Sequence, residues 1–282
     1  MSAMALTLED RAALEARARA VRAHTVQMAH DGKTPHVASS LSPVELLVAL
    51  YFRTMKIAPP GPTGPEDDRF VLSKGHGCLS WYATLAEKGY FPLAWLEGYA
   101  RDGSPLAEHP SPAGIPGCEI ATGSLGHGLA IAAGLALARQ LDRRAGRTFV
   151  LLSDGECNEG SVWEAAMFAA GRRLENLVAL VDYNKLQAMG RSDEITALAP
   201  LAEKWRAFGW SVRELDGHDL GAVCAALDAL PFEAGRPSAI VAHTIKGKGV
   251  SFMEGDLEWH YRPPSDQDLA RALAEINAPR SA

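Results

Sequence analysis

Two apolar runs, with strand-ending polar residues about thirty positions apart, constrain the fold of this chain most. Phe149 to Leu152 is typical of a buried strand and is followed by Asp154-Gly155. Leu177 to Val181 is a second such run, and Asn184 follows it. Between them, Ser161-Val-Trp-Glu164 has the pattern of a helix capping box, and helical composition follows. This strand–helix–strand pattern predicts two parallel strands that are neighbours in one sheet.

The predicted crossover places Asp154 and Asn184 at one edge of the sheet. Open α/β sheets bind ligands at the carboxyl ends of their strands. A carboxylate, an amide oxygen and the backbone N–H groups beside a glycine suit a hard divalent cation that holds a phosphate ester. Magnesium prefers about six oxygens, so we expect the Leu186 carbonyl, water and phosphate oxygens to complete the site. Asp182 is interpreted as a strand-end residue that is less well aimed at the ion.

The rest of the chain continues the alternation of strands and helices. The pattern predicts one doubly wound α/β domain over residues 1–282, with a mainly parallel sheet flanked by helices. We expect an N-terminal helix within residues 1–30, opened by Thr7, and a C-terminal tail over residues 263–282. Ser42-Pro43-Val44-Glu45 is interpreted as a second capping box. Further strands are expected at 69–73, 211–215 and 238–243.

Composition excludes several classes of function. A formal net charge of −6 argues against nucleic acid or an anionic membrane as partner. No apolar run approaches the ~20 residues of a membrane span. The four cysteines are scattered without a C-x-x-C pair, which indicates neither a zinc motif nor a disulfide framework and favours the reducing cytoplasm. Cys157 lies in the motif loop, but no neighbouring base would activate it, and loop packing is the simpler interpretation.

Glycines and histidines gather in the loops at the expected sheet edge. Gly75, Gly123, Gly155 and Gly247 each adjoin a strand end or a helix start, although their spacing fits neither a dinucleotide fingerprint nor a P-loop. Four histidines lie in or near the same loops, and we interpret them as an anion-binding, proton-shuttling pocket. The remaining histidines are interpreted as surface or packing residues. The pocket histidines are His36, His76, His109 and His260, and the others are His24, His30, His127, His218 and His243.

At these residues the sequence resembles the diphosphate-binding half of a transketolase. Ser153-Asp154-Gly155, followed about thirty residues later by Asn184, is similar to the family signature that holds Mg²⁺ on the diphosphate of thiamine diphosphate. The resemblance covers nearly the whole chain in order. The similar blocks are Arg69 to His76, His109-Pro110, Thr122 to Gly126, the central motif, and Lys246 to Met253.

The resemblance implies a role for each matching residue. Mg²⁺, which Ca²⁺ or Mn²⁺ could replace, would be bound by Asp154, Asn184 and the Leu186 carbonyl. His36, His109 and His260 resemble the histidines around the reacting carbon. Glu159 resembles a glutamate that is buried near the subunit interface and links two active sites. The implied contacts to thiamine diphosphate are Ser39, His76, Gly123, Ser124, Leu125, Gly155, Glu156, Asn184, Lys246 and His260.

The length of the chain, compared with that of a complete transketolase, implies a partner subunit. A complete transketolase is more than twice this size, and its second domain carries the glutamate that activates the cofactor. The resemblance therefore implies the N-terminal subunit of a split transketolase, which transfers a two-carbon ketol unit from a ketose to an aldose or other aldehyde. It would be active only with a separate C-terminal, pyrimidine-binding subunit, as an α2β2 heterotetramer.

Two departures from the family pattern leave alternatives open. Pro35 and Val37 flank His36 where the family has small residues, and Tyr261 follows His260 where glycine is usual. Both add bulk beside the expected donor site, so a specialised carboligase with a non-standard donor or acceptor is an alternative. A non-catalytic binding subunit is another. The α subunit of a 2-oxo acid dehydrogenase and a deoxyxylulose-phosphate-type synthase fit the Ser-Lys-Gly-His76 block less well.

Overall fold

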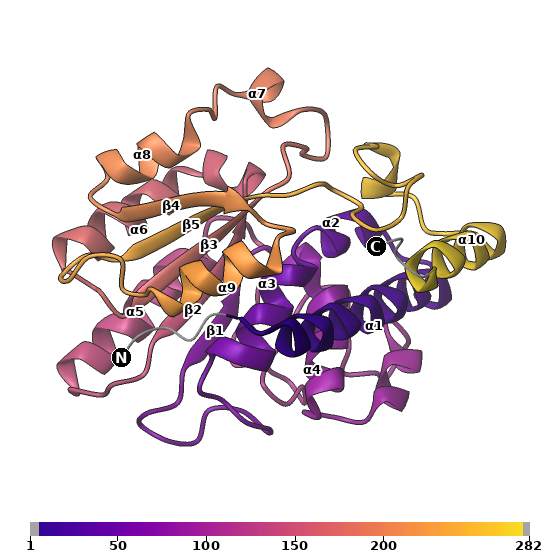
Figure 1. Cartoon of the computed structure of the whole chain (residues 1–282), viewed down its shortest axis with the longest axis horizontal. Coiled ribbons are helices and arrows are strands. Elements are labelled where there is room, and N and C mark those ends of the chain that lie inside the picture. The colour runs from indigo at the N-terminus through magenta and orange to yellow at the C-terminus, as the bar shows by residue number, and fades with distance from the viewer. Residues whose placement is uncertain (1–5, 279–282) are drawn as a thin grey trace.

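A five-stranded parallel sheet lies at the centre of the computed structural model, which describes residues 6–278 (Figure 1). Its strand order is β1-β2-β3-β5-β4, and every neighbouring pair is parallel. The expected doubly wound α/β fold with a parallel sheet is thereby confirmed. The strands are β1 (Arg69–Leu72), β2 (Thr148–Ser153), β3 (Leu177–Tyr183), β4 (Ser211–Asp216) and β5 (Ser238–His243).

Helices cover both faces of the sheet, and each face has its own apolar core (Figure 1). Successive strand residues alternate between the cores: Phe149 and Leu151 join one, while Val150 and Leu152 join the other. This alternation follows from the two-residue side-chain period of a strand. The first core is covered by α1 (Leu8–Gly32), α2 (Val37–Leu41), α3 (Val44–Ala49), α4 (Cys78–Lys88) and α9 (Leu220–Asp228). The second is covered by α5 (Gly128–Leu141), α6 (Gly160–Gly171) and α8 (Leu201–Ala207).

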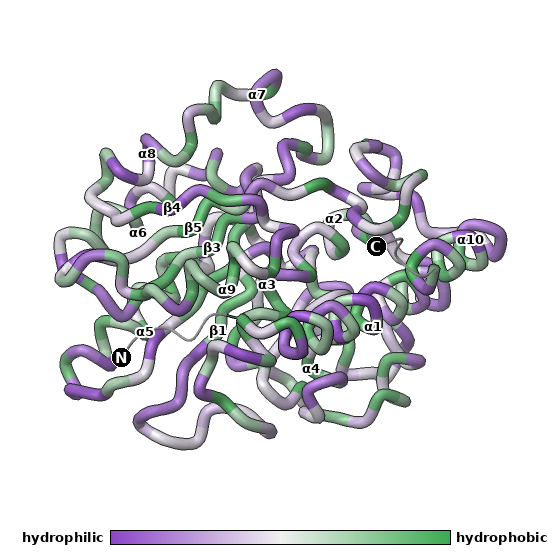
Figure 2. Tube along the Cα trace, viewed as in Figure 1, coloured by the Kyte–Doolittle hydropathy of each residue, from purple (hydrophilic) through white to green (hydrophobic). Residues whose placement is uncertain are grey.

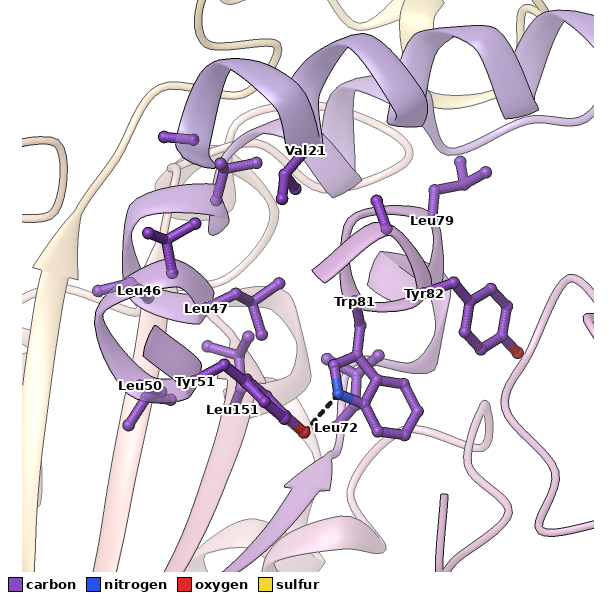
Figure 3. Packing of buried hydrophobic residues seen from close by; sticks show 14 of the residues in the cluster. Val21, Leu46, Leu47, Leu50, Tyr51, Leu72, Leu79, Trp81, Tyr82 and Leu151 are labelled. Atoms are coloured by element: carbon purple, nitrogen blue, oxygen red, sulfur yellow. Dashed lines mark hydrogen bonds between the residues drawn. The ribbon is translucent and has the colours of Figure 1, made fainter. Parts of the chain in front are cut away.

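The strands β2 and β3 are buried on both sides and apolar through their middle, as the hydropathy colouring shows (Figure 2), with polar residues only toward their ends. Within the first core the Trp81 indole N–H donates to the Tyr51 hydroxyl at 2.7 Å (Figure 3). The remaining helices are α7 (Ser192–Ile195) and α10 (Asp266–Asn277). A π-helical turn spans Leu50–Thr54, and 3-10 turns span Gly75–Gly77, Leu93–Gly98, Gly155–Asn158 and Glu258–His260.

The β2–α6–β3 crossover has the predicted arrangement. Ser153 is in register with Asp182, and the Asp154 amide donates to the Asp182 carbonyl at 3.2 Å. The predicted capping box at Ser161 is wrong, because α6 begins at Gly160 and the Ser161 hydroxyl donates to the Gly126 carbonyl at 2.9 Å. Ser161 therefore links the start of α6 to the loop before α5.

The predicted capping box at Ser42 is also wrong. The residue at the N-cap of α3 is Pro43, and no side chain of the described residues caps that helix. The Ser42 hydroxyl contacts the Asp182 carboxylate at 2.5 Å instead, while Glu45 pairs with Arg22. The two side chains that the local pattern assigned to a helix cap therefore bind partners elsewhere in the fold.

Both ends of the described chain are helical. The expected N-terminal helix is α1, and the Thr7 hydroxyl accepts from the Asp10 amide at its start. The segment predicted as a tail, residues 263–282, contains the helix α10, which packs on α1. Its N-terminus has a capping box formed by Ser265 and Asp268, a pattern that was readable in the sequence. Residues 1–5 and 279–282 lie outside the described part of the chain.

Within residues 6–278, no helix is long and apolar enough to cross a membrane. All four cysteines lie in this part of the chain, where they are buried and unpaired. The Cys157 sulfur donates to the Ser153 carbonyl at 3.5 Å, and burial raises the pKa of its thiol well above the usual value. Cys157 is therefore a packing residue in this structure.

Candidate active site

A cavity of about 540 Å³ opens at the carboxyl ends of the strands. Loops that follow β1, β2 and β3 meet there with the start of α2 and the segment after β5. The sequence-predicted residues that line it are His36, Ser39, His76, His109, Gly123, Leu125, Asp154, Gly155, Glu159, Asn184, Leu186 and His260. The structure therefore brings most of the candidate residues into one place, although their roles stay predictions.

The expected metal ligands lie together at the ends of β2 and β3. The Asp154 carboxylate is buried and accepts from the Lys185 amide at 2.9 Å and the Ser192 hydroxyl at 2.6 Å. The Asn184 amide is held from both sides: its Oδ1 accepts from the Leu186 amide at 3.1 Å, and its Nδ2 donates to Ser42 at 3.3 Å. These contacts fix the direction of the two oxygen-bearing side chains.

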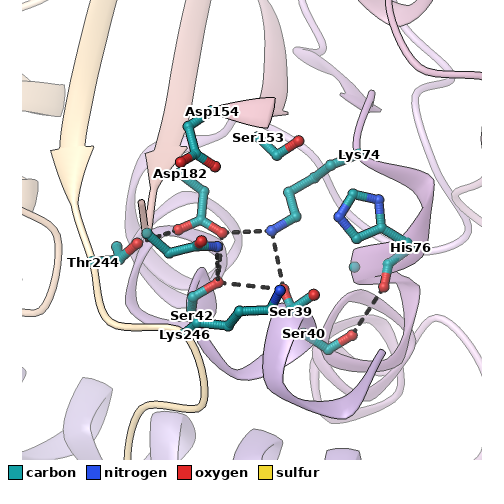
Figure 4. Close-up of polar contacts among 12 residues, drawn as sticks. Ser39, Ser40, Ser42, Lys74, His76, Ser153, Asp154, Asp182, Thr244 and Lys246 are labelled. Atoms are coloured by element: carbon teal, nitrogen blue, oxygen red, sulfur yellow. Dashed lines mark hydrogen bonds and ion pairs between the residues drawn. The ribbon is translucent and has the colours of Figure 1, made fainter. Parts of the chain in front are cut away.

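A buried ion pair lies directly behind this edge (Figure 4). Lys74 Nζ is 2.5 Å from Asp182 Oδ2, and neither side chain is exposed at all. The hydroxyls of Ser42 and Thr244 also donate to the Asp182 carboxylate. Lys74 additionally donates to the Ser39 carbonyl at 3.0 Å. Asp182 is thus fully engaged within the protein, in agreement with its interpretation as a strand-end residue rather than a metal ligand.

Four histidine rings cluster in the lining of the same cavity. The His36 ring centroid lies 5.6 Å from that of His76, 6.0 Å from that of His109 and 5.0 Å from that of His260. His36 has a left-handed backbone (φ 72°), and its amide donates to the His260 carbonyl at 2.9 Å. A histidine in this conformation is uncommon, which is typical of residues whose position serves a site.

The environment keeps three of these histidines neutral near pH 7. Burial and the neighbouring His109 lower the pKa of His36 to about 4. Burial and the Lys246 ammonium lower the pKa of His260 to about 3. Burial and Lys74 lower the pKa of His76 well below its usual value. A neutral imidazole offers one donor and one acceptor, so the cluster can bind hydroxyl groups and move protons.

Lys246 lies under the floor of the cavity rather than in its lining. Its Nζ is 2.8 Å from His260 Nδ1 and 3.3 Å from the Gln187 carbonyl. Because an ammonium only donates, His260 Nδ1 must accept, and the ring proton is then on Nε2. Burial, followed by the charge of Lys74, lowers the pKa of Lys246 to about 8, so it remains mostly charged at neutral pH.

Two other predicted cofactor contacts also lie outside the lining. Glu156 is fully buried, and its carboxylate accepts from the Ser73 hydroxyl at 2.5 Å and the Gly126 amide at 2.9 Å. It ties together three loops behind the cavity. Ser124 is exposed, and its carbonyl lies 3.2 Å from His127 Nδ1.

Glycines permit the close packing of these loops. A Cβ at Gly123, whose φ is +139°, would lie 2.8 Å from the His109 ring. A Cβ at Gly75 would lie 2.7 Å from the Gly123 amide. The β1 loop and the loop before α5 therefore approach backbone to backbone, which requires glycine at both positions.

Sequence reasoning assigned no role to several residues in and behind the cavity. Lys74 resembles a solvated lysine at a strand end, and no local signal identifies its partner Asp182. The segment after Asn184 carries no motif or periodicity, although it supplies part of the wall. Tyr261, which the sequence analysis singled out beside His260, is 63% exposed at the mouth, and its ring lies 4.7 Å from that of His260. The missed lining residues are Ser153, Asn158, Gln187, Ala188, Ile195 and Thr196.

The residues present fit a divalent cation with a phosphate-bearing ligand. Among residues 6–278, no group of three or more His, Cys, Asp or Glu side chains could hold a metal by itself. A metal at this edge would therefore need amide, carbonyl and ligand oxygens beside Asp154. Burial raises the pKa of Asp154 to about 6, so a nearby cation would offset the desolvation of its carboxylate.

Comparison with known proteins identifies the family. Residues 11–276 match the family described as the thiamine diphosphate binding domain of transketolase. The chain belongs to the transketolase family. It is 45% identical over 268 residues to a 6-deoxy-6-sulfo-D-fructose transketolase subunit from Clostridium sp. (strain MSTE9), which covers 95% of this chain and 98% of that protein. It is 42% identical over 264 residues to an apulose-4-phosphate transketolase subunit from Actinobacillus succinogenes, at 93% and 95% coverage.

Solved transketolase structures have the same fold. The transketolase from Leishmania mexicana superposes with a TM-score of 0.87 at 30% identity, over 93% of this chain and 41% of that one. Human transketolase is 38% identical over 272 residues, which are 94% of this chain and 42% of the human protein. The chain therefore spans about two fifths of these longer transketolases and nearly all of the two relatives named as subunits.

We expect the transketolase fold to depend on Lys74. Replacement by methionine leaves the buried Asp182 carboxylate without its cation, which typically costs about 3–5 kcal/mol of unfolding free energy. The double variant Lys74→Met/Asp182→Asn should recover a large part of that loss, because the uncompensated charge is gone. Urea unfolding followed by circular dichroism measures both. A double variant no more stable than Lys74→Met would contradict the ion-pair interpretation.

The histidine cluster predicts that stability falls in mild acid. A histidine whose folded pKa is about 4, against 6.5 in the unfolded chain, binds its proton preferentially when unfolded. Its contribution is complete above pH 6.5 and is lost as pH falls toward 4. In His36→Asn, the fall in unfolding free energy between pH 7 and pH 5 should be smaller than in the wild type. Thr196→Ala, another lining residue, is the control, and equal falls in all three proteins would refute the prediction.

Proposed function

We propose that this chain is the thiamine diphosphate-binding subunit of a transketolase that transfers a two-carbon ketol unit from a ketose to an aldehyde acceptor. One observation carries the proposal: a single cavity is lined by Asp154, Asn184 and Leu186 together with four clustered histidines. Membership of the transketolase family supports the same conclusion.

In this proposal different residues of the chain bind the metal ion and the diphosphate. Asp154, Asn184 and the Leu186 carbonyl bind Mg²⁺, which Ca²⁺ or Mn²⁺ could replace. The buried charge of Lys246 lies nearby and favours the diphosphate. Gly155 lets backbone approach the cofactor closely. Thiamine diphosphate, when bound, supplies the carbanion chemistry that breaks and makes the carbon–carbon bond.

The histidines bind and orient the sugar and move its protons. Because Lys246 donates to His260 Nδ1, the His260 Nε2–H is a donor for a substrate oxygen. The lowered pKa of His36 leaves it neutral, so one ring nitrogen is free to accept a hydroxyl proton. General acid–base catalysis by such groups typically contributes ~10²–10⁴-fold in rate.

The substrate is proposed to be a specialised ketose rather than a standard sugar phosphate. The two relatives above, at 45% and 42% identity, are named for 6-deoxy-6-sulfo-D-fructose and apulose-4-phosphate. Tyr261 supports a changed specificity, because its exposed ring stands at the mouth beside His36 and His260. An aldose or another aldehyde would accept the ketol unit.

A partner subunit completes the proposed enzyme. The charged side chains that line the cavity within residues 6–278, other than the histidines, are the acidic Asp154 and Glu159. A sulfonate or phosphate on the substrate therefore needs cations from elsewhere. We propose a C-terminal, pyrimidine-binding subunit in an α2β2 heterotetramer, supported by relatives that are themselves named as subunits. The unpaired cysteines support a cytoplasmic location.

Asp154→Ala should abolish metal-dependent cofactor binding. Mutation of a residue outside the ligand shell typically costs 10–100-fold in metal affinity, so loss of a ligand should cost at least ~100-fold. Titration calorimetry of thiamine diphosphate with and without Mg²⁺ measures this, and the exposed Asp142→Ala is the matched control. Cofactor binding that is independent of Mg²⁺ and of Asp154, even with the partner present, would support the non-catalytic alternative.

The chain alone should not turn over ketose at an appreciable rate. The reason is that the cofactor-activating glutamate is expected on the partner subunit. Turnover should appear when a pyrimidine-domain chain is added and should saturate near one partner per chain. Mixing at varied ratios, with aldehyde release followed by a coupled assay, measures the dependence. Full activity of the purified chain by itself would exclude a split enzyme.

A further inference from the structure

A charged cluster built on a buried ion pair lies behind the loop that carries Lys246. Arg22 comes from α1, Glu45 from α3 and His218 from the turn between β4 and α9. Arg22 Nη2 is 2.7 Å from Glu45 Oε1, and His218 Nδ1 is 3.0 Å from Glu45 Oε2. Arg22 and Glu45 are only 4% and 5% exposed. None of the three lines the cavity.

The cluster holds the Lys246 loop on both sides of the lysine. The Ile245 amide donates to His218 Nε2 at 2.8 Å, one residue before Lys246. Arg22 Nε donates to the Lys248 carbonyl at 2.9 Å, two residues after it. Gly249 makes this approach possible, because a Cβ there would lie 2.9 Å from the Arg22 side chain.

These contacts fix the protonation pattern of the cluster. His218 Nε2 accepts a backbone proton, so the ring proton is on Nδ1 and is donated to Glu45. Burial opposes ionisation of Glu45, but Arg22 and His218 outweigh it and lower the pKa of the carboxyl. The three side chains therefore form one charge-assisted network with a single arrangement of donors and acceptors.

The same loop also contacts residues of the site. Lys246 Nζ contacts His260 Nδ1 at 2.8 Å, and the hydroxyl of Thr244, two residues earlier, donates to Asp182. The loop is thus held at two places. The Asp182 carboxylate accepts from Thr244 at its start, and the Arg22–Glu45–His218 cluster contacts the backbone on either side of Lys246. Displacement of the backbone by a few tenths of an ångström would move the ammonium relative to the cavity.

We infer that Arg22, Glu45 and His218 are positioning residues that set the place of the Lys246 ammonium for binding an anionic diphosphate. This inference rests on the proposed function, since it takes the diphosphate as the anion that Lys246 attracts. It assigns a role to Asp216-Gly-His218-Asp219, where the sequence interpretation had left His218 as a surface or packing residue. The structure shows that both ring nitrogens of His218 are hydrogen-bonded, and the proposed positioning role goes beyond packing.

The test removes the acceptor of the Ile245 amide. In His218→Ala, the affinity for thiamine diphosphate with Mg²⁺ should fall about tenfold, the effect of losing about one hydrogen bond. In the background Lys246→Met, the same substitution should change affinity by less than about twofold, because its effect passes through the ammonium. Calorimetry on the full chain, with its partner where needed, gives all four values. A tenfold effect in both backgrounds would overturn the inference.

Two further variants separate positioning from general destabilisation. His24 also pairs with a glutamate, at 3.1 Å from Glu87, but this pair lies away from the loop, so His24→Ala should leave affinity unchanged. His218→Gln keeps one acceptor and one donor and should restore part of the lost affinity. No rescue by glutamine, or an equal loss in His24→Ala, would count against a specific role.

A measurement without cofactor distinguishes this inference from the proposed function. Acetylation of Lys246 by acetic anhydride, followed by peptide mass spectrometry, should be faster in His218→Ala than in the wild type and His24→Ala. If the wild type binds no thiamine diphosphate under any condition, the proposed function fails, but the labelling rates still decide whether the cluster positions Lys246. Equal labelling rates in all three proteins would overturn the inference.

Discussion

The carboxylate of Asp182 is the group on which the site's architecture depends. It stands near the end of the central strand β3 with no exposure to solvent, and it receives Lys74, Ser42 and Thr244. These partners come from the ends of β1 and β5 and from the α2–α3 junction. A buried charge that loses a partner is strongly destabilising, so these segments are held in one arrangement. The floor of the cavity is consequently a rigid platform rather than a set of independent loops.

The same buried cations set the chemistry in front of that platform. Lys74 and Lys246 are close enough to help lower the histidine pKa values, together with burial. An arrangement that attracts an anion therefore also keeps the imidazoles neutral and able to both accept and donate. Asp154 favours a cation instead. Burial raises the pKa of its carboxyl, and a neighbouring cation would stabilise the ionised form. One cavity thus combines a group that favours a cation with buried cations that favour an anion.

Most of the fold and the centre of the site could be predicted from the sequence, for a physical reason. Apolar runs followed by Asp154 and Asn184 predict parallel neighbours, because a short helical crossover permits little else. The two capping boxes failed where a hydroxyl found a tertiary partner, as Ser161 does with the Gly126 carbonyl. Lys74 was missed because its partner lies 108 residues away, beyond any local pattern.

The contacts of His218 could not be predicted from the sequence around it. Asp-Gly-His-Asp after a strand is an ordinary turn, and nothing in it distinguishes a solvated ring from one hydrogen-bonded at both nitrogens. Its contacts are a glutamate 173 residues earlier and a backbone amide 27 residues later. Burial and the charge of Lys74 lower the pKa of Lys246 to about 8, and the backbone on either side of this lysine is held by His218 and Arg22. Groups that do this lie outside the cavity, and only the folded arrangement relates them to it.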